Sequence, residues 1–442
     1  MKTIVLFGAG KSATVLIEYL ISEGQKNNWL LIIADVSKDL IESKTGNAVN
    51  TKAVQSDITN DTERQSLIQQ ADIVISMMPA QLHYLIAKDC VAFKKNLLTA
   101  SYVDEGVKEL KQAIEENELL FLCEMGLDPG IDHMSAMQLF HSIEEKGGTI
   151  TSFTSHCGGL IAPESDNNPW HYKISWNPRN IVLAGKAGAV YKDQGTVITK
   201  HYKEVFENCS VVNVDTLGAY AWYPNRDSLS YISVYHLEKA ETFLRTTLRH
   251  PAFCHGWDKI IHLGLTDTDD GSNILDCVTY ADWFSRKLFF VEQREMSWEE
   301  YLDLYVEENH HEALTTQFNY LGVMEKNNLP KQYSCSADIL QFLAESKFAM
   351  QPDDKDMIVM LHEIGYKLNG ETSSLKSRLI VKGDNSLHTA MAKTVGLPLG
   401  IAAKLILQHK IQVKGLHIPV IKEIYAPVLA ELKTHGIAFH EH

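Results

Sequence analysis

The sequence has few cysteines, and their arrangement excludes two common classes of small domain. Seven cysteines are spread over 442 residues, and no two of them form a C-x-x-C pair. A disulfide framework usually needs an even set of cysteines, and a zinc knuckle needs paired ligands. Neither type of fold is therefore indicated, and we expect the thiols to be reduced.

Positive charge is also scarce. The chain has 41 Lys and Arg residues against 56 Asp and Glu residues, which gives a formal net charge of −15. Nucleic-acid binders usually carry a basic face, and anionic membrane surfaces also attract basic proteins. The composition therefore predicts neither a nucleic-acid partner nor a membrane partner. An acidic substrate would need a local cluster of arginine or lysine.

Long hydrophobic runs are missing at the N-terminus. The first apolar stretch stops at Gly8, where a glycine turn follows. This stretch is too short for the core of a signal peptide or for a membrane span. We therefore expect a cytoplasmic protein.

The first 126 residues alternate between two patterns. Short apolar runs predict buried parallel strands at 4–7, 30–34, 53–55, 73–77, 96–99 and 119–123. Amphipathic stretches between them predict helices at 12–22, 61–70, 81–93 and 104–117. Such alternation is typical of β-α-β units, so the sequence predicts an α/β fold with a Rossmann-type, doubly wound parallel sheet.

The character of the chain changes after Gly130. Longer mixed strands, at 150–156, 197–202 and 211–214, predict an α+β domain with an antiparallel sheet. We assign residues 127–385 to this second domain, with a helical insertion at about 284–349 and one more strand at 379–382. Helices are expected at 386–394, 399–408 and 421–434, and residues 386–442 are expected to complete the first domain, 1–126.

A glycine-rich turn follows the first predicted strand and has the pattern G-x-G-x-x-A. The first glycine permits a tight turn, the second lets a pyrophosphate approach the backbone, and the alanine keeps helix and strand close. The N–H groups at the helix start favour phosphate. The alternative is a glycine turn that binds nothing. The expected cofactor contacts are Gly8, Gly10, Lys11, Ser12 and Ala13.

An acidic residue, Asp35, ends the second predicted strand. A carboxylate there accepts hydrogen bonds from the ribose hydroxyls and repels a 2′-phosphate. The sequence therefore predicts NAD as the cofactor, with NADP less favoured.

Two further segments lie where ligands bind in open α/β folds. Ser101 and Tyr102 follow the fifth predicted strand at the carboxyl edge of the sheet. The glycine-rich and acidic segment 124–133 follows the sixth strand, and Asp128 is expected to lie in the cleft between the domains. Asp128, Asp132 and His133 could instead be metal ligands, but no second group with ligand spacing supports this, and Asp132 could simply cap a helix.

The basic cluster that an acidic substrate needs occurs later in the chain. Arg226 lies in a proline-led loop, and Arg245 and Arg249 are four residues apart, on one face if that stretch is helical. Guanidinium groups bind carboxylates in a two-pronged fork, which suits a substrate with several carboxylates. The alternative is pairing with neighbouring acids on a solvated surface. Cys157, before two glycines, is either a polar site residue or a small buried hydrophobe.

Several longer motifs resemble the glutamate-forming saccharopine dehydrogenases, from end to end and in order. These motifs are 99–102, 126–134, 157–159, 162–164, 168–169, 223–228, 247–249, 355–360 and 390–398. The segments 414–416 and 422–427 resemble the closing part of the saccharopine dehydrogenase half of the bifunctional aminoadipic semialdehyde synthases. The chain is therefore identified as a member of this family.

The resemblance implies a reaction and a set of site residues. Family members oxidise saccharopine with NAD(P)+ and water to L-glutamate and 2-aminoadipate 6-semialdehyde, or run in reverse, in lysine metabolism. It also implies a homodimer formed through the second domain. By carry-over, the residues that handle protons are Tyr102, Asp128 and Cys157; those that hold the substrate are Ser101, Tyr102, Arg226, Thr247, Leu248 and Arg249; and those that line the nicotinamide are Gly126, Leu127 and Asp128.

Some positions depart from the family pattern. Ile161 replaces a proline, Thr246 replaces a glycine and His250 replaces a tyrosine, while Ala34-Asp35 replaces the Cys-Arg of the fungal NADP-dependent members. One alternative function is a related imine-reducing dehydrogenase of the carboxynorspermidine or homospermidine type, although a polyamine would require acids in place of the arginines. Another is a non-catalytic NAD(P)-sensing binder.

Overall fold

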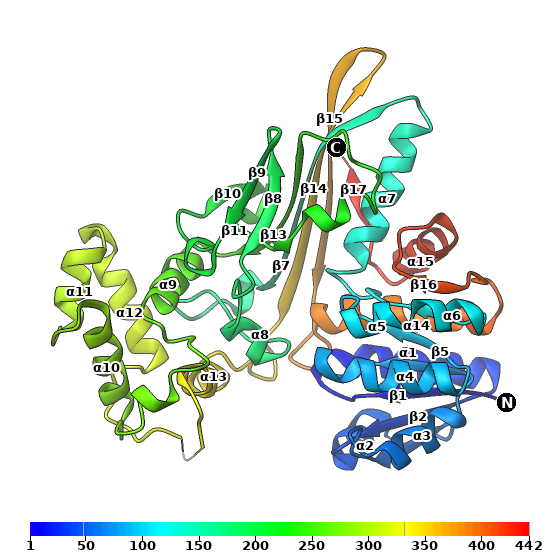
Figure 1. The fold of residues 1–442 in the computed structure, drawn as a ribbon, viewed down its shortest axis with the longest axis horizontal. Helices are drawn as coiled ribbons and strands as arrows, with labels where there is room; N and C mark the ends of the chain where they lie inside the picture. Colours follow the sequence, from blue (N-terminus) through cyan, green and yellow to red (C-terminus); the bar gives the residue numbers. More distant parts are fainter. Residues whose placement is uncertain (47, 331, 442) are drawn as a thin grey trace. The chain divides into compact units, whose positions relative to one another are not determined.

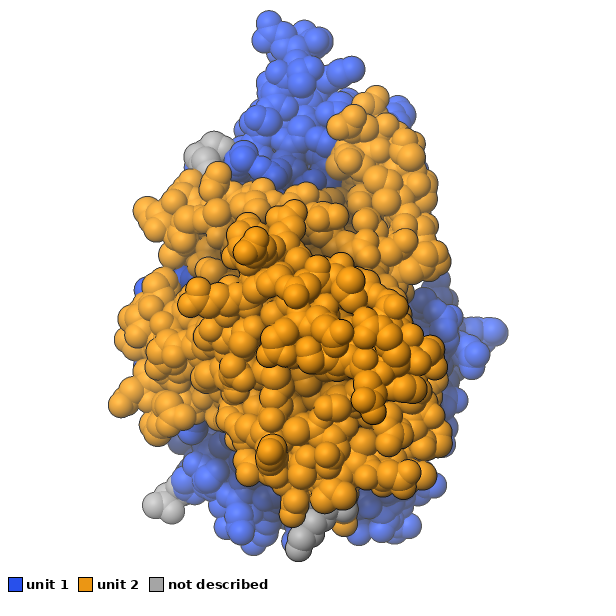
Figure 2. Space-filling model, turned by 90° about the vertical axis from the view of Figure 1, so that its left-hand side faces the viewer, with its two compact units in different colours: residues 1–157, 231–240, 357–442 blue, residues 158–230, 241–356 orange. Residues whose placement is uncertain are grey.

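The computed structural model describes residues 1–46, 48–330 and 332–441, which form two compact units. Unit 1 comprises residues 1–157, 231–240 and 357–442, and unit 2 comprises residues 158–230 and 241–356 (Figure 2). The predicted first domain lies within unit 1, which also contains residues 127–157, 231–240 and 357–385. Positions 47, 331 and 442, which the predicted domain ranges include, lie outside the described residues.

Unit 1 contains a seven-stranded parallel sheet with the strand order β16-β6-β5-β4-β1-β2-β3 (Figure 1). Its strands are β1 (Lys2–Phe7), β2 (Trp29–Asp35), β3 (Thr51–Gln55), β4 (Ile73–Ser76), β5 (Asn96–Thr99), β6 (Leu120–Leu122) and β16 (Gly415–His417). The helices between them are α1 (Thr14–Asn27), α2 (Lys38–Thr45), α3 (Asp61–Gln69), α4 (His83–Ala92), α5 (Glu105–Glu109) and α6 (Lys111–Glu116). The predicted Rossmann-type sheet is confirmed.

The central strands form the core of this sheet because both of its faces are covered by helices. Val5 on β1 pairs in register with Ile32 on β2 and with Val74 on β4, and all three side chains are buried. Burial of each such side chain stabilises the fold by about 1.5–3 kcal/mol. Unbroken apolar strands are therefore required here, which explains why the sequence pattern was informative.

The strand order reverses direction between β1 and β4. From β1 the chain proceeds to β2 and β3 on one side, and from β4 to β5 and β6 on the other. In open α/β sheets, ligands bind outside the carboxyl ends of the strands at this switch point. Gly8 and Met77, which directly follow β1 and β4, mark that position.

The C-terminal part of the chain returns to the same sheet. Strand β16 pairs in parallel with β6, and it was not predicted from the sequence. The two helices expected at 386–394 and 399–408 are one continuous helix, α14 (Ala390–Leu407), so that prediction was wrong. Gly396 and Gly400 bring α14 close to Leu16 and Tyr19 of α1, and this packing offsets the backbone hydrogen bond lost at Pro398.

Helix α14 is also long and apolar enough to cross a membrane, and it is the one described helix that meets this criterion. However, 83% of the qualifying stretch is buried inside the protein. Its apolar composition is therefore accounted for by packing in unit 1. The last helix, α15 (Lys422–Thr434), packs on α14 and on α7 (Ile131–Glu144).

Two sheet regions follow the parallel sheet in the chain. In unit 1, the long hairpin of β14 (Asp356–Leu368) and β15 (Glu371–Lys382) is antiparallel, with β17 (His440–Glu441) beside β15. In unit 2, the strands are β8 (Ala189–Asp193), β9 (Thr196–Lys200), β10 (Ser210–Val214), β11 (Gly218–Pro224), β12 (Arg226–Asp227) and β13 (Thr242–Arg249). Strand β7 (Thr149–Ile161) begins in unit 1 and ends in unit 2.

Unit 2 is completed by a group of helices (Figure 1). These are α8 (Pro178–Val182), α9 (Pro251–His262), α10 (Tyr280–Glu292), α11 (Trp298–Tyr305), α12 (His311–Leu321) and α13 (Ser336–Lys347). The buried core of unit 2 is rich in aromatic side chains. At its centre, Trp170 is fully buried, contacts Phe253 and Trp257 edge-on, and donates its indole N–H to the Gln317 carbonyl at 2.8 Å. A buried indole needs such an acceptor.

Candidate functional site

The glycine turn after β1 has the geometry that the motif predicts. Gly8 adopts a φ of 98°, and its N–H donates to the Ala34 carbonyl at 2.9 Å. A Cβ at this position would lie 3.0 Å from the Met77 carbonyl oxygen. Both the positive φ and the close approach therefore require glycine here.

Gly10 has the open space that the second position of the motif requires. Its φ of −61° is open to any residue, but a Cβ added there would meet nothing within 4 Å. A short 3-10 turn, Lys11–Ala13, follows and leads into α1, and Ala13 is 1% exposed. The turn therefore offers open space beside the start of a helix, and these residues fit a dinucleotide pyrophosphate.

Asp35 lies at the end of β2, beside this turn. One carboxylate oxygen accepts the Ala9 N–H at 2.8 Å, and the other accepts the Ser37 N–H at 3.1 Å. Lys44 of α2 reaches the same turn, where its ammonium donates to the Gly10 carbonyl at 2.5 Å. Burial lowers the pKa of Lys44 to about 8, against the opposing attraction of Asp35 and Glu18. The turn is therefore flanked by a carboxylate, that of Asp35, and by a cation, that of Lys44.

A buried histidine connects three hydroxyl side chains at the carboxyl edge of the sheet. His83, at the start of α4, has Nδ1 2.8 Å from Ser76 Oγ and Nε2 2.7 Å from Ser101 Oγ. Thr99 Oγ1 lies 3.4 Å from the same Nε2 and also accepts the Ser101 N–H at 3.2 Å. Burial lowers the pKa of His83 to about 4, so the imidazole is neutral near pH 7. The Ser101 hydroxyl is thereby held in a fixed position.

The segment after β6 forms a tight turn before α7. Gly126 donates to the Pro129 carbonyl at 3.0 Å, and Ile131 donates to the Gly126 carbonyl at 2.9 Å. Gly130 has a φ of 145°, and a Cβ there would lie 2.1 Å from the Gly126 oxygen. The Asp128–Pro129 peptide bond is cis.

This turn is adjacent to the segment that follows β5. Met125 N–H donates to the Thr99 carbonyl at 3.0 Å, and Glu124 N–H donates to the Ser101 carbonyl at 3.1 Å. The structure therefore brings the predicted residues Ser101 and Gly126 into neighbouring segments of unit 1. Leu127 is buried, and Tyr102 and Asp128 are partly exposed.

The alternative of a metal site in this region receives no support. Asp132 accepts the Gly130 N–H at 2.6 Å at the start of α7, a contact that stabilises the helix terminus. His133 Nε2 lies 2.8 Å from Glu124 instead. Among residues 1–46, 48–330 and 332–441, no group of three or more His, Cys, Asp or Glu side chains is arranged to hold a metal ion.

Glu124 is the centre of a second buried network. Its Oε2 accepts the Tyr231 hydroxyl at 2.9 Å, and its Oε1 accepts the Val103 N–H at 3.2 Å. His133, which contacts the same carboxylate, also bonds through Nδ1 to the Tyr235 hydroxyl. One carboxylate therefore fixes three parts of unit 1: the segment after Tyr102, helix α7 and the segment 231–240.

In unit 2, the predicted arginines lie on a strand and not on a helix. Arg245 and Arg249 belong to β13, and the helical alternative was wrong because this β-branched stretch pairs with β11. Alternation along a strand still places residues four apart on the same face. Arg249 is 4% exposed; it donates to the Leu248 carbonyl at 2.8 Å and lies 5.4 Å above the centre of the Tyr172 ring.

The remaining predicted substrate residues of unit 2 lie on the same strand or on the short strand β12. Thr247 pairs in register with Tyr223, and Leu248 is fully buried. A Cβ at Gly158 would lie 2.7 Å from the Leu248 Cβ, so the first glycine after Cys157 is needed for close packing. Arg226 is exposed with a φ of 52° on the short strand β12. Cys157 is 5% exposed and is the last residue of β7 within unit 1.

Sequence reasoning missed three residues of these networks, namely Lys44, His83 and Glu124. No helix is predicted over 38–45, where α2 lies, so the sequence pattern gives Lys44 no position. His83 falls within the predicted helix 81–93 without a role, although its place at the start of the helix that follows β4, at the switch point, is a signal that could have identified it. Glu124 was noted only as an acid of its segment.

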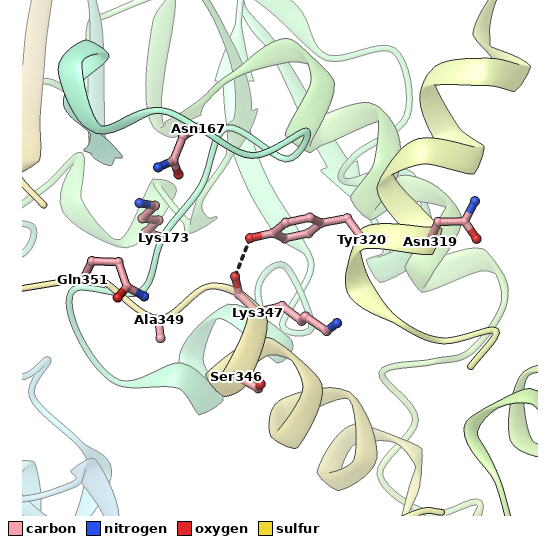
Figure 3. Close-up of a pocket in the computed structure, with 8 residues that line it drawn as sticks. All are labelled: Asn167, Lys173, Asn319, Tyr320, Ser346, Lys347, Ala349 and Gln351. Atoms are coloured by element: carbon pink, nitrogen blue, oxygen red, sulfur yellow. Dashed lines mark hydrogen bonds between the residues drawn. The ribbon is translucent and has the colours of Figure 1, made fainter. Parts of the chain in front are cut away.

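None of these residues lines the pocket shown in Figure 3, which is about 470 Å³ in volume and belongs to unit 2. The Tyr320 hydroxyl donates to the Lys347 carbonyl there at 2.7 Å. Lys173 is neutralised by Asp354 at 2.6 Å. A second pocket, of about 320 Å³, lies near Lys2 and Asp72 at the amino edge of the parallel sheet, away from the carboxyl edge where ligands bind.

Comparisons with known proteins agree with this geometry. Residues 4–122 match the family model described as the saccharopine dehydrogenase NADP binding domain, and residues 126–437 match the saccharopine dehydrogenase C-terminal domain. The alpha-aminoadipic semialdehyde synthase of Bos taurus, named as mitochondrial, is 34% identical over 99% of this chain and 47% of its own length.

Two fungal comparisons cover whole proteins. The NADP(+)-dependent, L-glutamate-forming saccharopine dehydrogenase of Saccharomyces cerevisiae is 28% identical over 100% of this chain and 99% of its own. A solved apo structure of the L-glutamate-forming enzyme from that yeast has a TM-score of 0.87 at 27% identity, again over 100% and 99% of the two chains. By contrast, the chain spans about half the length of the curated synthases that it matches.

Proposed function

Because the chain belongs to the saccharopine dehydrogenase family, we propose that it oxidises saccharopine with NAD(P)+ and water to L-glutamate and 2-aminoadipate 6-semialdehyde, or catalyses the reverse reaction. The observation that carries the proposal is the glycine turn at the switch point of the parallel sheet, with open space at Gly10. The full-length similarity to the yeast enzyme supports the same reaction.

Unit 1 would hold the cofactor through Gly8, Gly10, Asp35 and the start of α1, with Gly126 and Leu127 beside the nicotinamide. When bound, the nicotinamide accepts a hydride from the carbon that bears the substrate amine. The secondary amine must lose its proton beforehand, and water then attacks the resulting imine of the substrate. Proton transfer in such steps needs a group within hydrogen-bond reach and with a suitable pKa.

Tyr102 and Asp128 are our first choices for moving these protons, and Cys157 is a third. Ser101, fixed by His83, would orient the substrate amine or a nearby carboxylate. In unit 2, Arg226 and Arg249 would bind the substrate carboxylates, with Thr247 and Leu248 shaping the surroundings. A substrate with three carboxylates requires fixed cations in its site. A guanidinium group provides a positive charge and can also donate two parallel hydrogen bonds to one carboxylate.

The choice between the two nicotinamide cofactors has opposing support. The yeast relative and the matched family model are both named for NADP. The carboxylate of Asp35 at the end of β2 favours NAD. The coarser conclusion, a nicotinamide dinucleotide, is common to both. Asp35→Ser should raise the ratio of NADP to NAD turnover if the carboxylate repels the 2′-phosphate.

The test of the function is saccharopine-dependent absorbance at 340 nm, measured with NAD+ and with NADP+ separately. Reduction of either cofactor, together with glutamate as a product, supports the proposal. If cofactor binds and no reduction occurs, the chain is a non-catalytic sensor. If a polyamine-derived imine is reduced instead, the chain acts as an imine-reducing dehydrogenase of the carboxynorspermidine or homospermidine type.

A homodimer and a cytoplasmic location are further proposals; family likeness supports the first, and seven free cysteines, which suit a reducing compartment, support the second. The mass of the protein in solution, from sedimentation velocity, tests the first. Fractionation of cells that produce the natural gene product tests the second.

A further inference from the structure

Lys44 occupies an unusual place for a helix-end lysine. It is 34 residues from Gly10 in sequence, yet its ammonium donates to the Gly10 carbonyl at 2.5 Å. Gly10 is the position where the turn is open and where a dinucleotide would approach the backbone. A cation is therefore already positioned at the rim of the proposed cofactor site.

The surroundings of Lys44 favour an additional anion. Within the described part of the chain, Lys44 makes no ion pair. Glu18, one of the two acids that attract it, bonds to His388 at 2.7 Å. Burial costs the ammonium part of its hydration, and an opposite charge in contact would compensate for that loss.

Asp35, the other acid, is held by the backbone. Its two oxygens accept the N–H groups of Ala9 and Ser37, so the carboxylate cannot turn away from the turn without losing both bonds. Lys44 lies near enough to Asp35 for the two charges to interact. The negative charge that would repel a 2′-phosphate is therefore offset by a neighbouring positive charge.

We propose that Lys44 is the residue that binds the 2′-phosphate of NADP, and that it allows this turn to accept NADP as well as NAD in spite of Asp35. This inference rests on the proposed binding of a nicotinamide dinucleotide. Lys44 would then determine cofactor specificity from α2, a helix that the sequence pattern did not predict. The alternative is that Lys44 only satisfies the Gly10 carbonyl.

The experiment measures the binding of two cofactor fragments to the full chain by calorimetry. The fragments are 2′,5′-ADP, which carries the 2′-phosphate, and 5′-AMP, which lacks it. Lys44→Met removes the charge and keeps the length of the side chain, and Lys44→Arg keeps the charge. Lys38→Met is the matched control, because Lys38 lies on the same helix, is 52% exposed and pairs with Glu42 at 3.1 Å.

The expected result is selective. Lys44→Met should weaken 2′,5′-ADP about tenfold or more, in line with the loss of one charge-assisted contact. Binding of 5′-AMP should change by less than about twofold under the same relation. Lys44→Arg should restore most of the affinity for 2′,5′-ADP, and Lys38→Met should behave like the unmodified protein.

Two other results would overturn the inference. Equal weakening of both fragments would mean that Lys44 supports the turn without reading the 2′-phosphate, and no weakening would mean that it takes no part. If the unmodified chain bound neither fragment, the proposed dinucleotide site itself would fail. That outcome is separate, because it does not depend on any variant.

Discussion

The glycine turn of unit 1 and the arginine strand of unit 2 are held in place by contacts of different range. At the turn, Ala9 and Asp35 are 26 residues apart and belong to one β-α-β unit. On the arginine strand, Arg249 lies 3.5 Å from the carbonyl of Gly159, which is 90 residues away, and its guanidinium lies over Tyr172. The turn is therefore a property of one local motif, whereas the arginine depends on the assembled unit.

This difference predicts how each region responds to substitution. A change in the turn should alter cofactor binding and leave unit 2 folded. A change at Arg249 removes a buried charge that also packs against aromatic rings, so its effects on binding and on folding must be measured separately.

The largest effect is expected from Arg249→Ala. Loss of a carboxylate-binding guanidinium should raise the Michaelis constant for saccharopine about 100-fold, which is about 2.7 kcal/mol. The measurement is steady-state kinetics with a thermal-unfolding curve of the same sample.

Arg249→Lys is the control, since it keeps the charge and loses the fork. Cofactor affinity should stay unchanged in both variants. An unchanged Michaelis constant in a folded Arg249→Ala protein would remove this residue from the substrate site.

A smaller effect concerns pH and His83. Its folded-state pKa of about 4 lies below the ordinary 6.5, so the unfolded chain takes up a proton that the folded chain does not. Stability is therefore lost as pH falls from about 6.5 towards 4, by about 2 kcal/mol between pH 7 and pH 5 from this one group.

Urea unfolding of the normal chain and of His83→Asn, at both pH values, tests this. The variant should show a flatter dependence on pH, although His362, whose pKa is also lowered to about 4 by burial, still contributes. Identical pH dependence in the two proteins would show that folding does not lower the pKa of His83.

The smallest effects come from a matched pair of glycines in the turn. Gly8→Ala should destabilise the fold by roughly 1–2 kcal/mol because of its positive φ. Gly10→Ala should leave stability nearly unchanged, since its Cβ meets nothing, but should weaken cofactor binding several-fold. Unfolding curves and cofactor titrations separate the two. Equal behaviour of both variants would contradict the roles assigned to them.

Local pattern was sufficient to predict the parallel sheet and the turn. Strands such as β1 and β4 are buried on both faces, so their apolar runs could be recognised directly. Asp35 and Ala13 were predicted because the motif fixes their spacing from Gly8. These are features that one β-α-β unit determines by itself.

Long-range contacts explain what could not be predicted. β16 is three residues long and forms only because β6 offers an open edge. α14 continues through Pro398 because α1 packs against its glycines. The link from Glu124 to Tyr231 spans 107 residues. The two partners in each of these contacts are far apart in the sequence, so a pattern within a short stretch cannot predict them.

The path of the chain through unit 1 has a consequence for synthesis. Residues 357–442 supply an edge strand and the helix against α1, yet they follow all of unit 2 in the chain. A ribosome would release the first 157 residues long before these pieces exist. Unit 1 must therefore wait, with an uncovered sheet edge and an exposed face of α1, until residues 357–442 have been translated. During that interval the incomplete unit exposes apolar surface and an unpaired strand edge, so we expect chaperone binding to be strongest then.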